Sequence, residues 1–285
     1  MRHHRLSGRA RRRARAASCC IPETYEMLSS EIELPAVHDG DAIDAYFTQE
    51  EPRENRAPSR CAVIVLPDNA GYEAKTARSL ADRLALFCLA LVLVPDIHRG
   101  QAPLPAEMTP QQDRVALDVR TAAVYLRADH RVGPIALFGV GSGGSLVLRS
   151  LCVNAEAAGI DAAGGAAICP SAFNYDDLSH GLRAPTMMLF DPSIAREAEA
   201  AASARRLLAN AGEPGGTASD TPHRVQEFHG LAARCGLMDE SGPDENEDGA
   251  GGGDDESDSP SNAEDGLIMA EAWITLQLQR ARTTD

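Results

Sequence analysis

From about residue 60 onward, short apolar runs alternate with longer segments in which apolar and polar residues recur at helical spacing. The apolar runs predict buried strands at 61–67, 89–95, 134–138, 164–170 and 184–190, followed by a strand at 223–228. The periodic segments predict helices at 73–87, 110–129, 145–159, 193–212 and 264–281. Earlier in the chain, 30–36 and 43–47 are expected to form a short antiparallel pair. This alternation predicts an α/β fold with a mostly parallel central sheet and helices on both faces.

Three of the predicted helices have an apolar stripe that should face the core. The stripes recur every three to four residues, as a helix with one buried face requires. They comprise Ala77, Leu80, Ala81 and Leu84; Val115, Val119, Ala122 and Leu126; and Leu267, Ala270, Trp273 or Ile274, and Leu278.

Two segments of biased composition divide the chain. Residues 1–28 form a basic extension, with seven arginines and no acid in residues 1–22, which we expect to be disordered and which is a transit-peptide candidate. Residues 237–262 are acidic, glycine-rich and too polar to be packed, so we expect a disordered insertion. One domain should then comprise residues 29–236 together with 263–283.

Charge and composition exclude several classes of protein. The net charge is −15, and without its basic start the chain has 20 basic residues against 42 acidic ones, so binding to nucleic acid is not expected. No apolar run is long enough for a membrane span. The seven cysteines have no zinc-ligand spacing, and Cys152 and Cys169 lie in apolar runs, so both should be core residues. We therefore expect no metal and no cofactor, and a cytoplasmic location, or an organellar one if the basic start is a transit peptide.

A glycine-rich turn, "FGVGSGG", follows the predicted strand at 134–138. Gly139, Gly141 and Gly144 match the G-x-G-x-x-G dinucleotide fingerprint, which would indicate NAD binding. That fingerprint requires an acid at the end of the next strand, where this chain has Cys169-Pro170-Ser171. The alternative is a nucleophile elbow, a strained strand-to-helix turn that carries a catalytic side chain between small residues.

The order of elements and the motif "GVGSGG" (139–144) resemble the dienelactone hydrolase family of the α/β-hydrolase fold, over most of residues 30–280. The family motif is G-x-C-x-G-G, so Gly141 stands where the nucleophilic cysteine belongs. "VLPDNAGYEAK", "VLVPDIHRGQAP" and "FHGLAARC" resemble three further family segments. The resemblance implies a hydrolase of lactones or small esters, anionic ones included.

The resemblance also assigns roles to individual residues. His229 matches the catalytic histidine, with Arg234 as its neighbour, and Arg99 matches an arginine that contacts an anionic substrate. Asp68 replaces a glutamate that assists the thiol. The backbone N–H groups of Asn69 and residue 142 are the expected donors of an oxyanion hole, which stabilises a tetrahedral intermediate.

The chain departs from the family pattern at its catalytic centre. A glycine cannot attack an acyl carbon, so covalent catalysis at position 141 is lost. Ser142 is the candidate for a relocated nucleophile, although a shift of one residue turns its side chain about 100° around the helix. Asp191 is the candidate for the third member of the triad, about three residues earlier than in the family.

Each of these residues also has a structural interpretation. Asp68 could cap the helix that starts near Tyr72, Arg99 could be a surface residue and His229 a structural histidine. Two functions follow: an impaired hydrolase, or a non-catalytic protein that binds a small anionic ligand or a protein partner.

Overall fold

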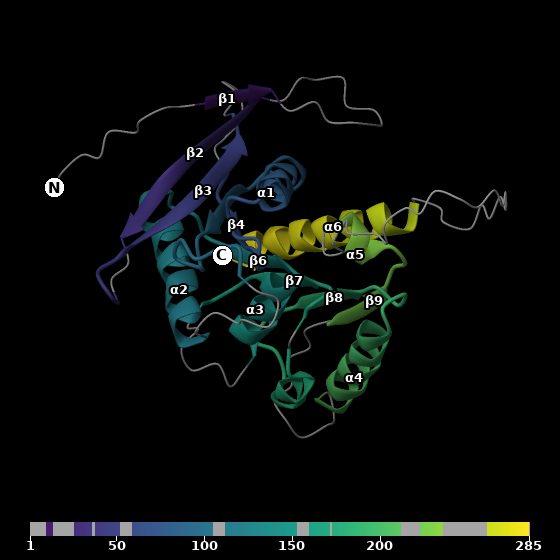
Figure 1. Cartoon of the computed structure of the whole chain (residues 1–285). Coiled ribbons are helices and arrows are strands. Elements are labelled where there is room, and N and C mark those ends of the chain that lie inside the picture. The colour runs from purple at the N-terminus through teal and green to yellow at the C-terminus, as the bar shows by residue number, and fades with distance from the viewer. Residues whose placement is uncertain are drawn as a thin grey trace, which may run out of the picture.

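The computed structural model describes nine stretches of the chain and carries the fold drawn in Figure 1. The described residues are 10–13, 26–35, 38–51, 59–104, 112–152, 160–171, 173–211, 223–235 and 261–284. Most of the basic extension, and residues 237–260 of the acidic segment, lie outside them.

One nine-stranded sheet forms the centre of the molecule, in the order β1-β2-β3-β5-β4-β6-β7-β8-β9. The first three strands and their contact with β5 are antiparallel, and all pairings from β5 to β9 are parallel. The strands are β1 (Ala10–Arg13), β2 (Glu26–Pro35), β3 (Ala42–Glu50), β4 (Ala62–Leu66), β5 (Leu91–Pro95), β6 (Ile135–Val140), β7 (Gly164–Ile168), β8 (Thr186–Phe190) and β9 (Arg224–Glu227).

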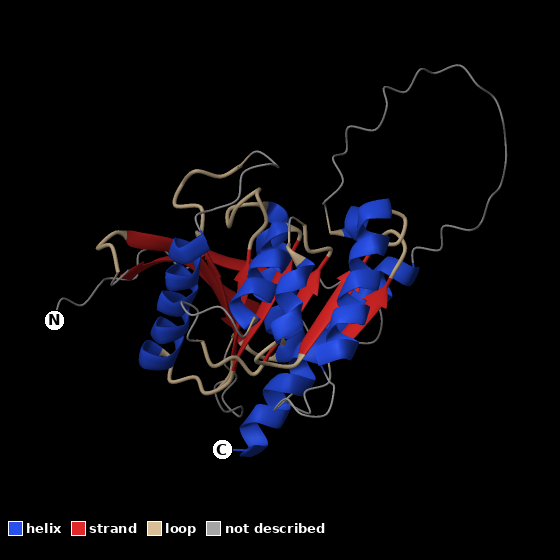
Figure 2. Cartoon of the chain, turned by 90° about the horizontal axis from the view of Figure 1, so that it is seen from below, coloured by secondary structure: helices blue, strands red, loops and turns tan. Residues whose placement is uncertain are grey.

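Helices cover both faces of the sheet, as Figure 2 shows. The helices are α1 (Lys75–Cys88), α2 (Gln112–Asp129), α3 (Ser142–Leu151), the 3-10 helix η1 (Tyr175–His180), α4 (Ala195–Ala211), α5 (Leu231–Arg234) and α6 (Ser261–Thr284). Side chains of α2, α3 and α4 belong to one hydrophobic cluster, and those of α1, α5 and α6 belong to another. The sheet lies between these two clusters, so the parallel strands β4, β5, β6 and β7 are buried on both faces and carry no polar side chain.

The predicted α/β architecture is confirmed, and so are the apolar stripes. Val115, Val119, Ala122 and Leu126 of α2 are buried, as are the stripe residues of α6, while Leu80 of α1 is partly buried. Cys152 and Cys169 are core residues, 4% and 1% exposed.

Some elements differ from the sequence-based expectation. Helix α3 begins at Ser142, three residues earlier than predicted, because the glycine turn leads directly into it. Helix α6 begins at Ser261, inside the range expected for the acidic segment. Strand β1 and the first residues of β2 lie within residues 1–28, and η1 and α5 were not predicted.

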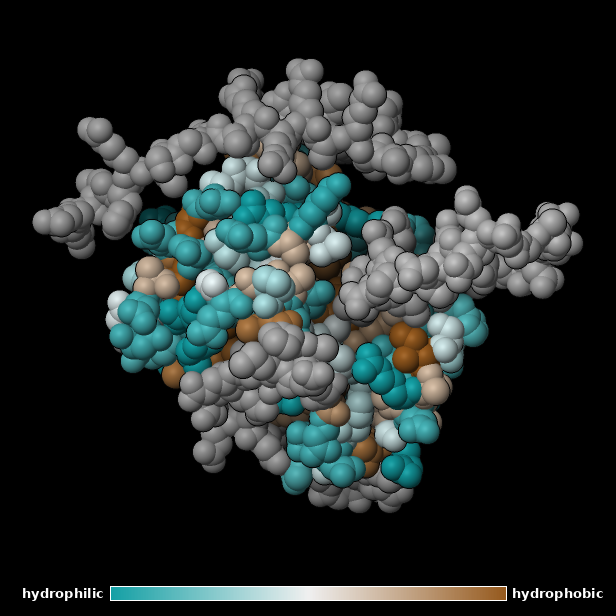
Figure 3. All heavy atoms as spheres, viewed as in Figure 1, coloured by the Kyte–Doolittle hydropathy of each residue, from teal (hydrophilic) through white to brown (hydrophobic). Residues whose placement is uncertain are grey.

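Hydrophobic residues on the face shown in Figure 3 are scattered among hydrophilic ones. Of the described helices, none is long and apolar enough to cross a membrane. The described residues also contain no group of three or more His, Cys, Asp or Glu side chains arranged to hold a metal ion.

Candidate active site

The turn between β6 and α3 has the backbone geometry of a nucleophile elbow. Gly141 connects the two elements with φ 59° and ψ −124°, a conformation that costs an L-residue strain energy. The backbone N–H of Gly141 donates to Ile168 O at 2.9 Å, and the carbonyl of Gly141 accepts from Ser145 N at 3.2 Å. These two hydrogen bonds hold the turn at Gly141, whose side chain is a single hydrogen atom.

The first turn of α3 packs directly against the end of β4. A Cβ atom built on Gly143 would overlap the carbonyl oxygen of Leu66 and lie 2.9 Å from that of Pro67. Only glycine permits this approach. It brings the start of α3 beside the loop that carries Asp68 and Asn69.

Ser142 is the first residue of α3, and its hydroxyl lies at the elbow. Its Oγ is buried and has no hydrogen-bond partner among the described residues. The first backbone N–H groups of a helix also lack partners within the helix, so the N–H of Ser142 is suitably placed to be an oxyanion donor.

Asp68 and Asn69 form a tight turn directly after β4. Oδ1 of Asp68 accepts from Ala70 N at 3.0 Å, and Asp68 O accepts from Gly71 N at 3.0 Å. Asp68 does not cap α1, since that helix begins after Ala74 and has no side-chain cap. Burial raises the pKa of the Asp68 carboxyl, while the Ala70 hydrogen bond acts in the opposite direction.

Two contacts from the 96–104 loop fix this turn. The Nε2 atom of His98 lies 2.8 Å from Asp68 O, and Leu104 N donates to Asn69 O at 2.8 Å. His98 is 1% exposed and stands in the "PDIHRG" segment, but sequence reasoning selected only Arg99 there. His98 is therefore a positioning residue for the turn that sequence reasoning missed.

His229 follows β9 in an exposed turn that leads into α5. Within the described part of the chain, no hydrogen bond or ion pair connects its imidazole to Asp191 or Ser142. Arg234, its expected neighbour, is the last residue of α5. The histidine thus lies in a loop at the carboxyl edge of the sheet, without the partners that a triad requires.

Asp191 is fully buried after β8, and both of its carboxylate oxygens are occupied. Oδ1 accepts from the backbone and hydroxyl of Ser193 at 3.0 and 2.5 Å, and Oδ2 accepts from Ala232 N at 3.0 Å. Burial raises the pKa of Asp191, but the hydrogen bonds from Ser193, Ala232 and Gly230 outweigh it and lower the pKa below its usual value. The carboxylate therefore holds the backbone of the loop that carries His229, instead of its imidazole.

Arg99 is bound in an ionic network away from the elbow. Its guanidinium donates to Asp118 Oδ2 at 3.1 Å and to Asp39 Oδ2 at 3.2 Å, and His38 Nε2 lies 3.2 Å from Asp118 Oδ1. The Asp118 side chain is fully buried, and the Arg99 side chain is 12% exposed. Arg99 joins the loop after β5 to α2 and to the turn before β3, so its charge is already neutralised.

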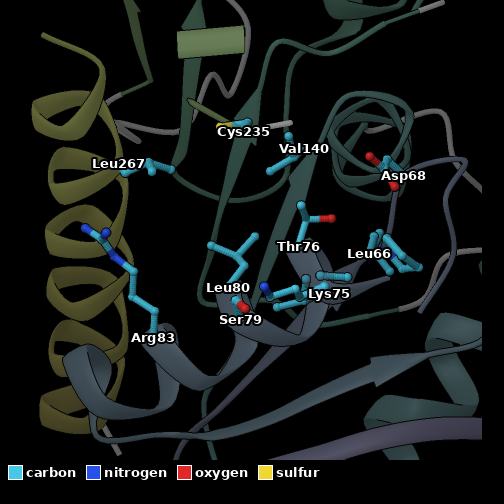
Figure 4. A pocket seen from close by; sticks show the side chains of 13 residues that line it. Leu66, Asp68, Lys75, Thr76, Ser79, Leu80, Arg83, Val140, Cys235 and Leu267 are labelled. Carbon is cyan, nitrogen blue, oxygen red and sulfur yellow. The ribbon is translucent and has the colours of Figure 1, made fainter. Parts of the chain in front are cut away.

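A cavity of about 380 Å³ lies against the elbow, on the side of the sheet covered by α1 and α6. Figure 4 shows side chains from these helices and from the strand ends around it. Three of the residues that line the cavity are Asp68, Val140, which precedes Gly141, and Cys235, which follows α5. Its other lining residues are Val65, Leu66, Pro67, Lys75, Thr76, Ala77, Ser79, Leu80, Arg83 and Leu267.

Comparison with known proteins supports the fold. No family model matches the chain, and no curated protein matches its sequence. A putative dienelactone hydrolase from Klebsiella pneumoniae matches with a TM-score of 0.58 and 18% identity, over 87% of this chain and 98% of that one. Brefeldin A esterase, a bacterial homologue of human hormone sensitive lipase, matches with a TM-score of 0.60 and 15% identity, over 93% and 81%.

A carboxyl esterase from the fungus Tuber melanosporum matches with a TM-score of 0.55 and 13% identity, over 92% of this chain and 89% of that one. The chain therefore has the α/β-hydrolase fold, as the resemblance implied. At these sequence identities the comparisons show the fold alone and do not show the chemistry of the site.

Proposed function

We propose that this chain is a dienelactone hydrolase-like protein that has lost covalent catalysis at its elbow and binds small ester- or lactone-like molecules. The observation that carries the proposal is Gly141, which has the backbone angles of an elbow and no side chain. Acyl transfer through an enzyme-bound intermediate requires a thiolate or alkoxide at that point.

The surroundings of the elbow support loss of catalysis. The carboxylate oxygens of Asp191 accept hydrogen bonds from Ser193 and Ala232, so His229 lacks the carboxylate that would orient it. A hydrolase that acts through a triad needs the nucleophile, base and orienting acid in one chain of hydrogen bonds, and none of these links is formed among the described residues.

A second candidate function is hydrolysis through Ser142. The observation in its favour is the unpartnered Oγ of Ser142, one residue from the elbow. Against it, that oxygen is buried, and no hydrogen bond connects it to His229 in the described part of the chain. The NAD-binding alternative has less support, because Gly139, Gly141 and Gly144 follow the third parallel strand of the chain rather than the first, and Cys169 follows the next strand.

A fluorophosphonate probe tests the proposal. This reagent phosphonylates a serine hydroxyl that an adjacent base has activated, so the proposal predicts no labelling of the full-length protein and no cleavage of p-nitrophenyl acetate above that of the Ser142→Ala variant. Labelling at Ser142 that disappears in Ser142→Ala would contradict it and establish the second candidate.

A further inference from the structure

We propose that the cavity beside the elbow is a binding site for uncharged, mostly apolar small molecules that carry a hydroxyl at one end, such as an alcohol or a hydroxy ester. The inference rests on the proposed function, because it specifies the ligand class of the same site. It differs from the anionic ligand expected from the sequence.

The size and walls of the cavity favour such a ligand. Its volume of about 380 Å³ lies within the range of roughly 300 to 1,000 Å³ that is typical of small-molecule sites. Val65, Val140 and Leu267 contribute apolar walls from β4, β6 and α6, and Leu80 adds another from α1. Figure 4 shows Leu80, Val140 and Leu267 around the central space.

The charges around the cavity give no net attraction for an anion. Arg83 lines it, but its Nη1 atom is bound to Glu264 at 2.6 Å and its Nη2 atom to Glu271 at 3.1 Å, with Nε also on Glu271. Glu271 is fully buried, so this guanidinium is committed to the packing of α1 against α6. The remaining charges are one acidic residue, Asp68, and one basic residue, Lys75, which is exposed.

Asp68 provides a polar contact at one end of the apolar space. Its Oδ1 accepts the Ala70 N–H, and among the described residues no donor is found for Oδ2. A carboxylate in this setting accepts a hydrogen bond from a hydroxyl and repels a second carboxylate. An uncharged ligand with a hydroxyl at one end therefore fits both the walls and the charge.

The test compares two molecules with the same hydrocarbon body, 4-phenylbutan-1-ol and 4-phenylbutanoate, by calorimetric titration of the full chain. We expect the alcohol to bind at least about tenfold more tightly, because the carboxylate would be desolvated beside Asp68. In Asp68→Asn this preference should fall. Equal affinities in the unsubstituted protein, or no binding of the alcohol, would overturn the inference.

Two variants locate the site. Leu80→Trp fills the cavity and should weaken alcohol binding at least about tenfold, whereas Val124→Trp, which places the same side chain at a different cavity on α2, should leave it within about twofold. Binding that survives Leu80→Trp would overturn the inference.

Lys75 gives a readout that needs no variant. It is the sole lysine of the chain and lines the cavity, so bound alcohol should slow its acylation by an amine-reactive ester. Acylation at an unchanged rate under saturating alcohol would contradict the inference. Neither 4-phenylbutan-1-ol nor 4-phenylbutanoate contains an ester bond. If neither molecule binds, the proposed loss of covalent catalysis is therefore unaffected.

Discussion

The backbone N–H of Ala232 donates a hydrogen bond to Oδ2 of Asp191 at 3.0 Å. This contact joins the loop after β8 to the first turn of α5 and thereby fixes the segment that follows His229. Asp191 is suited by its type and position to orient a catalytic histidine. In this structure its carboxylate binds the polypeptide backbone instead.

Replacing Asp191 by Asn should therefore act on stability. The amide keeps one acceptor but presents an N–H group toward backbone donors, which leaves buried polar groups unsatisfied. We expect a loss of about 1–3 kcal/mol in the free energy of unfolding at neutral pH, measured by urea denaturation.

The pH dependence of that loss has a definite sign. The pKa of Asp191 is lower in the folded chain than its usual value, so its contribution is present above about pH 4 and is lost as the pH falls through the folded pKa. The difference between the unsubstituted protein and Asp191→Asn should shrink below about pH 4. A difference that is constant across this range would contradict the assignment.

Arg99 should behave as a structural residue. In Arg99→Met, the buried Asp118 loses its bidentate partner, and we expect a destabilisation of about 3–5 kcal/mol in chemical denaturation. If the variant folds at low temperature, its affinity for 4-phenylbutan-1-ol should stay within about twofold. A stable Arg99→Met protein with impaired binding would instead support the substrate contact that the family resemblance implied.

The close approach of α3 to β4 can be tested with Gly143→Ala. The new methyl group would overlap the Leu66 carbonyl, and because backbone atoms cannot move as a flexible side chain does, we expect a loss of at least about 3 kcal/mol in thermal or urea unfolding. Gly40→Ala is the control for an uncrowded methyl group, since nothing lies within 4 Å of the added carbon, and its positive φ, which Gly143 does not share, is the source of its cost. It should cost only about 1 kcal/mol. Equal losses in the two variants would show that crowding at Gly143 costs no more than positive φ does at Gly40.

The sequence predicted the fold well because burial in this chain follows local periodicity. The α2 stripe from Val115 to Leu126 could be read from spacing alone, since a helix over a sheet buries one face. The position of the elbow was also predictable, because Gly141 lies between an apolar run and a helix start.

The partners of the polar site residues could not be predicted from the sequence. Asp191 binds a backbone group 41 residues away, and nothing in its own neighbourhood favours Ala232 over His229. Arg99 pairs with Asp118 of α2. The spacing of apolar residues in α2 does not indicate which residue Asp118 pairs with. Such pairings depend on how loops from different strands meet in space, and short-range patterns carry little information about that.

The central claim is that Gly141 occupies the place of a nucleophile on an otherwise intact elbow, and the most direct measurement is the acylation of a Gly141→Cys variant. Gly141→Ala is its control, since it introduces the same Cβ strain, about 1–3 kcal/mol, without a thiol. With both variants shown to be folded, p-nitrophenyl acetate should acylate the introduced thiol, as peptide analysis would show, and Gly141→Ala should show only the background acylation of the unsubstituted protein. A folded Gly141→Cys variant whose new thiol stays as inert toward the ester as the buried thiols of Cys152 and Cys169 would contradict the claim.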